Sequence, residues 1–166
     1  TLDTSFSGDG WVTTDSIGSE IANSVLIQPD GKIVIGGSDN IGFAFVRYTA
    51  SGELDTSLNK TGKRSIGFGQ NFGTVTKVLL QPDGAIIGVG NVSYSNPHSL
   101  SSALAVVRLL PNGTNDTSFN GTGRLIDSSS DQRLGNDAAL LADGSILIAG
   151  GSDYRPTNRA ARINMA

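Results

Sequence analysis

The chain has 166 residues, of which 22 are glycine, 5 are proline and none is cysteine, and its formal net charge is −3. This length suits one ordinary domain. The missing cysteines exclude a disulfide scaffold, a thiolate metal site and a cysteine nucleophile. A single histidine excludes a multi-histidine metal centre within one chain. The acidic balance argues against nucleic acid as a partner, and no apolar run approaches the roughly 18 residues of a membrane span.

Three sequence motifs recur in the same order along the chain. They are a Leu-Asp-Thr-Ser-Phe stretch followed by a glycine, a Gln-Pro-Asp-Gly stretch followed by an apolar run, and an arginine near the end of a second apolar run. Their copies begin, in that order, at Leu2, Leu54 and Asn115, at Gln28, Gln81 and Leu141, and at Arg47, Arg108 and Arg162. The nearly constant spacing divides a single repeat domain into three units, residues 1–53, 54–114 and 115–166.

Each unit has the pattern of short β-strands joined by tight turns. In the first unit, Ser24–Gln28 (strand A) and Lys32–Ile35 (strand B) flank a Pro-Asp-Gly turn, because proline and glycine set the backbone angles such a turn needs. Phe43–Thr49 (strand C) and Arg64–Ile66 (strand D) follow. No window has a convincing helical period. Four antiparallel strands per repeat predict an all-β fold of β-propeller blades, with a β-solenoid or β-prism as alternatives.

These motifs resemble a known repeat family. The pattern LDTSF-x-G-x-G, then QPDG-K-I-V-x-x-G, then F-x-x-x-R-Y-x-x-x-G is similar to the delta-60 repeat of bacterial proteins, over essentially the whole chain. The third unit departs from it where Leu141-Ala142 replaces Gln-Pro and Asn115 replaces Leu. The resemblance implies a propeller-like fold and an extracellular or cell-surface location. It supplies no set of catalytic residues.

The phase of the repeats predicts an assembly. The chain starts with a strand of the D type, Trp11–Thr14, and ends on a strand of the C type, Arg159–Ala166, with no D strand after it. Propellers typically have about 4 to 8 blades, so three blades would leave strand edges open. We expect a homodimer that forms a six-bladed ring, in which each N-terminal strand completes the partner's third blade. The alternative is that the chain is a three-blade piece of a longer polypeptide.

Several repeated residues are interpreted as structural. Asp3, Asp55 and Asp116 are expected to accept hydrogen bonds from backbone N–H groups two residues on, rather than to bind calcium or act as acids. Each repeated arginine is expected to bond a carboxylate or loop carbonyls, rather than an anion in a pore. Trp11 is expected to pack in a seam between blades, rather than to stack on a sugar.

The units differ most in the connections from D to A and from B to C, which emerge on the same face of a propeller. Differing loops on a rigid scaffold are where function is expected. The candidate ligand-binding residues are Asn23, Thr76, Asn136 and Asp137 at the starts of the A strands, and Tyr94, His98, Arg133, Tyr154 and Arg155 in the loops. No catalytic or metal-binding residue is assigned, since no nucleophile motif accompanies His98.

These observations favour a non-enzymatic binding module that holds a glycan, a small molecule or a protein on the D–A and B–C loop face. Two alternatives remain open: a hydrolase-like or lactonase-like propeller with a site at the channel mouth, and a structural spacer of a large surface protein. No cofactor is expected, with calcium as the alternative. The expected partners are a second copy of the chain and a glycan or small-molecule ligand, and neither nucleic acid nor a membrane.

Overall fold

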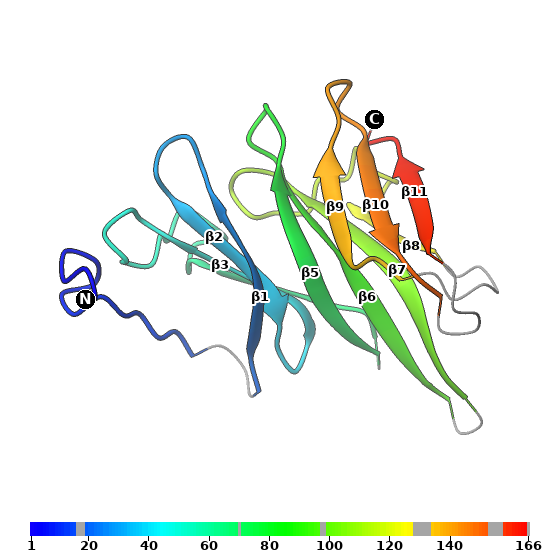
Figure 1. Ribbon diagram of the computed structural model, residues 1–166, viewed down its shortest axis with the longest axis horizontal. Coiled ribbons are helices and arrows are strands. Elements are labelled where there is room, and N and C mark those ends of the chain that lie inside the picture. Colours follow the sequence, from blue (N-terminus) through cyan, green and yellow to red (C-terminus); the bar gives the residue numbers. More distant parts are fainter. Residues whose placement is uncertain (16–18, 70, 97–98, 128–133, 153–157, 166) are drawn as a thin grey trace.

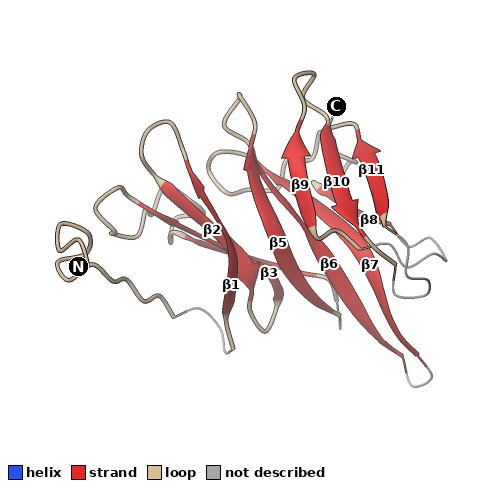
Figure 2. Ribbon diagram, viewed as in Figure 1, coloured by secondary structure: helices blue, strands red, loops and turns tan. Residues whose placement is uncertain are grey.

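The computed structural model describes all residues except 16–18, 70, 97–98, 128–133, 153–157 and 166. In this described part the chain forms eleven β-strands and no helix (Figure 2). The described residues therefore hold no helix of the length and apolar character needed to cross a bilayer. The all-β prediction is confirmed.

The strands form three antiparallel sheets. The first holds β1 (Ile21–Ile27), β2 (Ile33–Ser38), β3 (Gly42–Tyr48) and β4 (Lys63–Gly67). The second holds β5 (Phe72–Leu80), β6 (Ile86–Asn96), β7 (Ser99–Leu109) and β8 (Arg124–Asp127). The third holds β9 (Asp137–Leu140), β10 (Ile146–Gly150) and β11 (Arg159–Ile163). The first two sheets take their outer strands from the following sequence unit, and β11 has no such neighbour among the described residues.

The sheets lie side by side, with β1, β5 and β9 next to one another (Figure 1). Each of the two seams between sheets has its own hydrophobic core. Successive residues of one strand feed different cores because side chains alternate across a strand: Ile86 packs toward the first sheet and Ile87 toward the third. The first core includes Val34, Phe43, Phe45, Val75 and Val78, and the second includes Val89, Leu104, Ala138, Ile146 and Ile148.

The first strands of the first two sheets contain a β-bulge at the same repeat position. The extra residue is Asn23 in β1 and Thr76 in β5. Facing this region, a Cβ added to Gly37 or Gly90 would lie 1.8 or 2.0 Å from a carbonyl oxygen of the neighbouring strand, and one added to Gly150 would lie 1.8 Å from the carbonyl oxygen of Leu134, just before β9. The last glycine of the second motif is therefore required by the close approach of two backbones.

The N-terminal segment differs from the sequence-based prediction. Trp11–Thr14 was predicted as a strand, but residues 11–15 form none. A strand needs a paired neighbour, and no described strand pairs with this segment. Trp11 is 66% exposed, so no seam within the single chain holds its side chain. Thr14 nevertheless holds the segment to the first sheet, with its Oγ1 2.6 Å from the Tyr48 hydroxyl.

The turn before this segment keeps the form that it has in the other repeats. Gly10 N donates to Phe6 O at 2.8 Å, as Gly62 N donates to Leu58 O at 2.8 Å. It also docks in the same way. Ser7 N donates to a loop carbonyl after β3 (2.8 Å), and its counterpart Asn59 N donates to one after β7 (2.7 Å). Residues 3–10 thus sit on the first sheet as residues 55–62 sit on the second.

Candidate functional site

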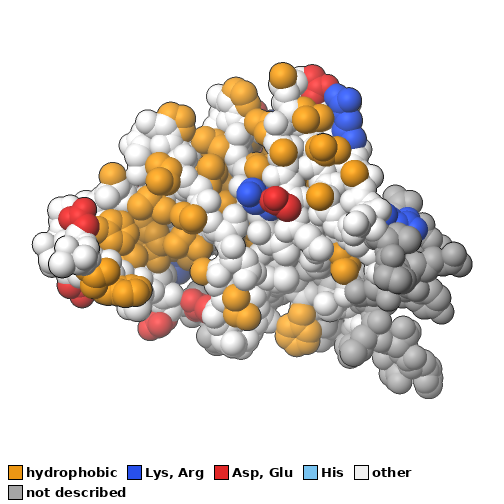
Figure 3. Space-filling model, viewed as in Figure 1, with side chains coloured by type: hydrophobic (Ala, Val, Ile, Leu, Met, Phe, Trp, Pro, Cys, Tyr) orange, Lys and Arg blue, Asp and Glu red, His pale blue; other side chains and the backbone are white. Residues whose placement is uncertain are grey.

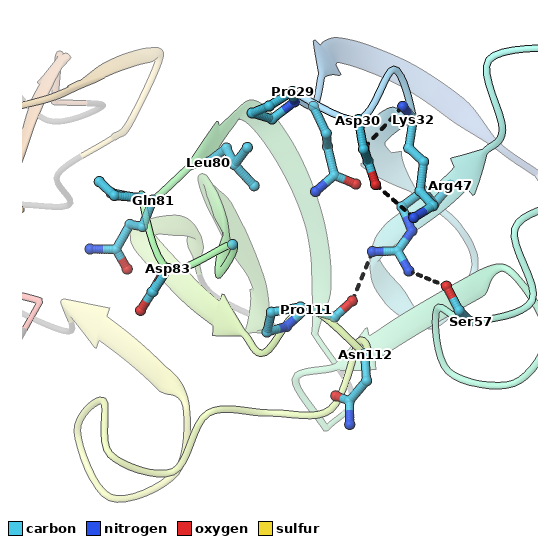
Figure 4. Close-up of a pocket in the computed structure, with 13 residues that line it drawn as sticks. Pro29, Asp30, Lys32, Arg47, Ser57, Leu80, Gln81, Asp83, Pro111 and Asn112 are labelled. Carbon is cyan, nitrogen blue, oxygen red and sulfur yellow. Dashed lines mark hydrogen bonds and ion pairs between the residues drawn. The ribbon is translucent and has the colours of Figure 1, made fainter.

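The arginines of β3 and β7 tie each strand to the turn that follows it, whereas Arg162 in β11 bonds Asp143 and Ser145 in the turn between β9 and β10. Arg47 Nε donates to Asp55 Oδ2 at 2.7 Å. Its Nη2 donates to Ser57 Oγ at 2.8 Å and its Nη1 to Pro111 O at 2.7 Å (Figure 4). Asp55 Oδ1 accepts from Ser57 N at 3.1 Å and from Ser57 Oγ at 2.6 Å. The structural roles predicted for the repeated aspartates and arginines are confirmed.

These contacts stabilise the ionised carboxylates. Burial is the largest single influence on Asp55 and opposes ionisation, but the hydrogen bonds from Ser57 and the charge of Arg47 together keep its pKa below the usual value. The hydrogen bond from the Ser118 hydroxyl is the main cause of the lowered pKa of Asp116. The hydrogen bonds and ion pairs of these turns account for the lowered pKa values, and no catalytic role is needed to explain them.

The second arginine, Arg108, makes a different set of bonds. Its Nε donates to Gln81 Oε1 at 2.6 Å, its Nη1 to Asp116 Oδ2 at 2.5 Å, and its Nη2 to Asp83 Oδ2 at 2.7 Å. Gln81 Nε2 donates across the second seam to Gly144 O at 3.1 Å. Both the oxygen and the nitrogen of the Gln81 side-chain amide are therefore hydrogen-bonded.

A groove of about 720 Å³ opens between the first two sheets, at the turns that join β1 to β2 and β5 to β6. We call it the turn groove. Its walls are drawn from the two Gln-Pro-Asp-Gly turns and from the loop after β7 (Figure 4). The lining residues are Gln28, Pro29, Asp30, Lys32, Arg47, Ser57, Leu80, Gln81, Pro82, Asp83, Gly84, Pro111 and Asn112. Gln28 Oε1 is buried and has no hydrogen-bond partner.

Polar side chains also cross the seams near the inner strands. Asn23 Nδ2 donates to Thr74 Oγ1 and to Val75 O, both at 2.9 Å. One seam further on, Thr76 Oγ1 donates to Gly135 O at 2.7 Å. The bulge residues of the first two sheets thus hydrogen-bond to the next sheet, either in its inner strand β5 or just before its inner strand β9.

Comparison with known proteins identifies the repeats. Residues 28–58 and 81–119 match the model of a family described as a domain of unknown function, DUF5122, β-propeller. These two matches and the three repeated antiparallel sheets support a β-propeller repeat. The sheets are accordingly called blades below, numbered one to three from the N-terminus. The search of curated proteins found no match.

The propeller repeat gives a role to the candidates at the A strands. Asn23 and Thr76 are bulge residues that join neighbouring blades, and Asp137 forms an ion pair with Lys77 at 3.1 Å. The hydrogen bond from Lys77 is the main cause of the lowered pKa of Asp137. Asn136 occupies the same repeat position as Asn23 and is exposed.

The loop candidates are not gathered into one site in the described part of the chain. Tyr94 is half-buried and packs against the first core. His98, Arg133, Tyr154 and Arg155 lie outside the described residues. Among the residues that are described, no three His, Cys, Asp or Glu side chains gather in a way that would hold a metal ion.

The turn groove was not predicted, because it lies at the opposite end of the blades from the D–A and B–C loops. The Gln-Pro-Asp-Gly turns repeat closely, whereas function was expected in the loops that differ between units. A signal was present in the residue after each turn glycine, which is Lys32, Ala85 or Ser145. Differences of this kind show that the turn ends of the blades are not equivalent.

Proposed function

We propose that two copies of this chain close a six-bladed β-propeller, and that the ring is a non-enzymatic binding module. The observation that carries the proposal is that one seam is used twice within the chain and is presented again, uncovered, at both ends.

The first uncovered face belongs to blade one. Ile27 is 70% exposed, whereas its repeat counterparts Leu80 and Leu140 are partly buried and pack against the cores. Hydrophobic side chains gather on this face beside β1 (Figure 3). An apolar surface that is buried in two of three equivalent positions favours a third covering of the same kind.

The second uncovered face belongs to blade three. Leu147 is 41% exposed, although its counterparts Val34 and Ile87 are fully buried at the two inner seams. Ala149 and Ala160 lie exposed on the same face, and the counterparts of Ala160 in the other blades, Phe45 and Val106, are buried. This face corresponds to the side of blades one and two that covers the following blade. It therefore fits the open face of blade one in a partner.

The open edge of β11 fits the N-terminal segment. Thr13 has the repeat position of Ser65, which pairs with Ala44 in blade one. By the same register, Thr13 would pair with Arg159 of a partner's β11. The extended segment at Trp11–Thr14 would then become a strand, and an unpaired edge would be removed. Asn136 of the partner would gain the role across the new seam that Asn23 has in this chain.

A closed ring would hold all D–A and B–C loops on one face, where we place the binding of a glycan, small molecule or protein. The long β6–β7 hairpin of blade two projects from this face (Figure 1). We assign this binding to the candidates that the sequence singled out in these loops: Tyr94, His98, Arg133, Tyr154 and Arg155.

Light scattering on a sizing column tests the assembly. The proposal predicts a species of twice the 17.1 kDa chain mass, whereas a well-folded monomer contradicts it and favours blades supplied by a longer polypeptide. Thermal melting with Ca²⁺ and with a panel of glycans tests the binding role, because a ligand of the folded state raises the transition temperature. A transition that no added ligand moves would favour a structural spacer.

A further inference from the structure

We infer that the turn groove is a binding site for a neutral saccharide, held by hydroxyl groups that donate to the buried Gln28 Oε1. The groove lies between blades one and two of a single chain. The inference therefore does not depend on ring closure, and it concerns the end of the blades opposite the proposed loop site.

The first step is the unused acceptor. Gln28 and Gln81 begin identical Gln-Pro-Asp-Gly turns, yet only Gln81 is satisfied, by Arg108 and by the Gly144 carbonyl. Gln28 Oε1 is buried with no partner. A buried amide oxygen without a hydrogen bond destabilises the folded chain. A donor from a ligand would remove that cost.

The second step explains why the chain leaves Gln28 unpaired. Arg47 is the counterpart of Arg108. Its Nε donates to Asp55, and its two Nη groups donate to Ser57 and Pro111. Lys32 donates to its neighbour Asp30 at 2.7 Å. The nearby basic side chains are therefore engaged elsewhere, and Gln28 Oε1 is left without a donor.

The third step is the charge and hydrogen-bonding character of the lining. Asp30 is paired with Lys32, Asp83 with Arg108, and Arg47 with Asp55. The lining itself holds two carboxylates, Asp30 and Asp83, and two cations, Lys32 and Arg47, and this balance of charge favours a neutral ligand. The carboxylates retain acceptor capacity beyond their ion pairs, whereas the Arg47 side chain is buried and already donates from all three of its nitrogens. A neutral molecule rich in hydroxyl donors matches this pattern.

The fourth step is shape. A volume of about 720 Å³ lies within the roughly 300–1,000 Å³ of small-molecule sites. Pro29, Pro82 and Pro111 supply stiff apolar walls, and Leu80 adds a fourth apolar surface. Apolar walls with a few fixed polar groups suit the C–H faces and hydroxyl edges of a sugar ring.

The test uses two-dimensional amide NMR of the full chain, titrated separately with maltose, cellobiose, lactose and diacetylchitobiose. We expect at least one disaccharide to shift amides of residues 28–32 and 81–85. The variant Gln28→Leu should weaken that binding at least tenfold. Its fold should be retained, because the third repeat already carries Leu141 at this position and removal of an unpaired acceptor is close to neutral.

Leu141→Gln is the matched control, since it makes the reverse change away from the groove and should leave the titration unchanged. The inference is overturned if none of the four sugars shifts these amides, or if Gln28→Leu binds as well as the parent chain. Shifts confined to residues 91–96 and 99–103 would support the loop-face site and also overturn this one. Loss of the dimer in light scattering would contradict ring closure and leave the groove intact.

Discussion

Val25 and Val78 hold the same position in successive repeats, but the side chain of Val25 is 66% exposed and that of Val78 is 2% exposed. The difference comes from the neighbouring blade. Blade one covers Val78, and no described residue covers Val25 to the same extent. Each repeat thus carries the residues of the same seam, and within the chain that seam forms only where one blade follows another.

The first prediction concerns this pair. Val25→Lys should leave a folded monomer, because it places a charge in the proposed seam between copies and changes nothing within the chain's own cores. Burial of one valine contributes about 1.5 kcal/mol or more. Loss at both seams of the ring should therefore raise the dissociation constant about 100-fold or more. Sedimentation equilibrium measures this, and an unchanged dissociation constant would place Val25 outside any interface.

The second prediction compares Asn23 of blade one with Asn136, which holds the same repeat position in blade three. Asn23→Ala removes two hydrogen bonds to blade two, so the free energy of unfolding should fall by about 1–2 kcal/mol. Asn136→Ala should leave the unfolding of a separated chain unchanged and weaken dimerisation. Urea unfolding and sedimentation, run on both variants, separate the two effects. Equal effects of both variants in both assays would argue against a shared repeat role.

The third prediction concerns the bulge. Gly90→Ala should lower the free energy of unfolding by about 3 kcal/mol, because its Cβ would lie 2.0 Å from Thr74 O and backbone atoms must move. Gly67→Ala is the control, since its nearest contact is the flexible Ile41 side chain at 3.3 Å. Chemical denaturation of both variants measures the difference. A tolerated Gly90→Ala would mean that the bulge is not fixed by this glycine.

The fourth prediction concerns acid. Folded-state pKa values of Asp55 and Asp116 are lowered, so their stabilising effect is complete above the ordinary aspartate value of about 3.9 and is lost as pH falls through the folded value. The free energy of unfolding should therefore decline steeply below about pH 4. Asp55→Asn should be less stable at neutral pH by about 3 kcal/mol, because it strands the buried Arg47.

Asp55→Asn should also show a shallower acid decline than the parent chain. Glu53→Gln, at an exposed position near the same turn, is matched for the change in charge. Melting temperatures between pH 2 and 7 provide the comparison. If the melting temperature of Asp55→Asn falls as steeply with decreasing pH as that of the parent, the Asp55 carboxylate does not contribute to the loss of stability in acid.

Much of the fold could be predicted from the sequence because its signals are local. The Pro-Asp-Gly turns, the apolar strands and the Asp-to-Ser turns all act within a few residues, and Gly31 has the positive φ of 81° that such a turn requires. Trp11–Thr14 was mispredicted because strand formation depends on a partner that local sequence does not specify.

The site was harder to predict because it depends on differences between contacts that look alike. Gln28 and Gln81 are identical in sequence, and only the direction taken by Arg47 or Arg108 decides which amide is satisfied. Asn23 and Thr76 were selected as ligand-binding residues, whereas in this chain they join blades. These polar residues at repeated positions make contacts between blades.

Ring closure through strand exchange is the central claim, and an engineered disulfide tests it most directly. The chain has no cysteine, so Thr13→Cys combined with Arg159→Cys gives the only thiols. Paired strand positions place Cβ atoms about 4.5–5.5 Å apart, close to the spacing of a disulfide. Thr13→Cys with Ala160→Cys is the control, because neighbouring strand residues point to opposite faces.

Under mild oxidation, the first double variant should run on a non-reducing gel as a covalent dimer of twice the 17.1 kDa chain mass, and the control should not. Chains that remain monomeric with free thiols, or equal cross-linking in the control, would contradict closure of the propeller by a second copy.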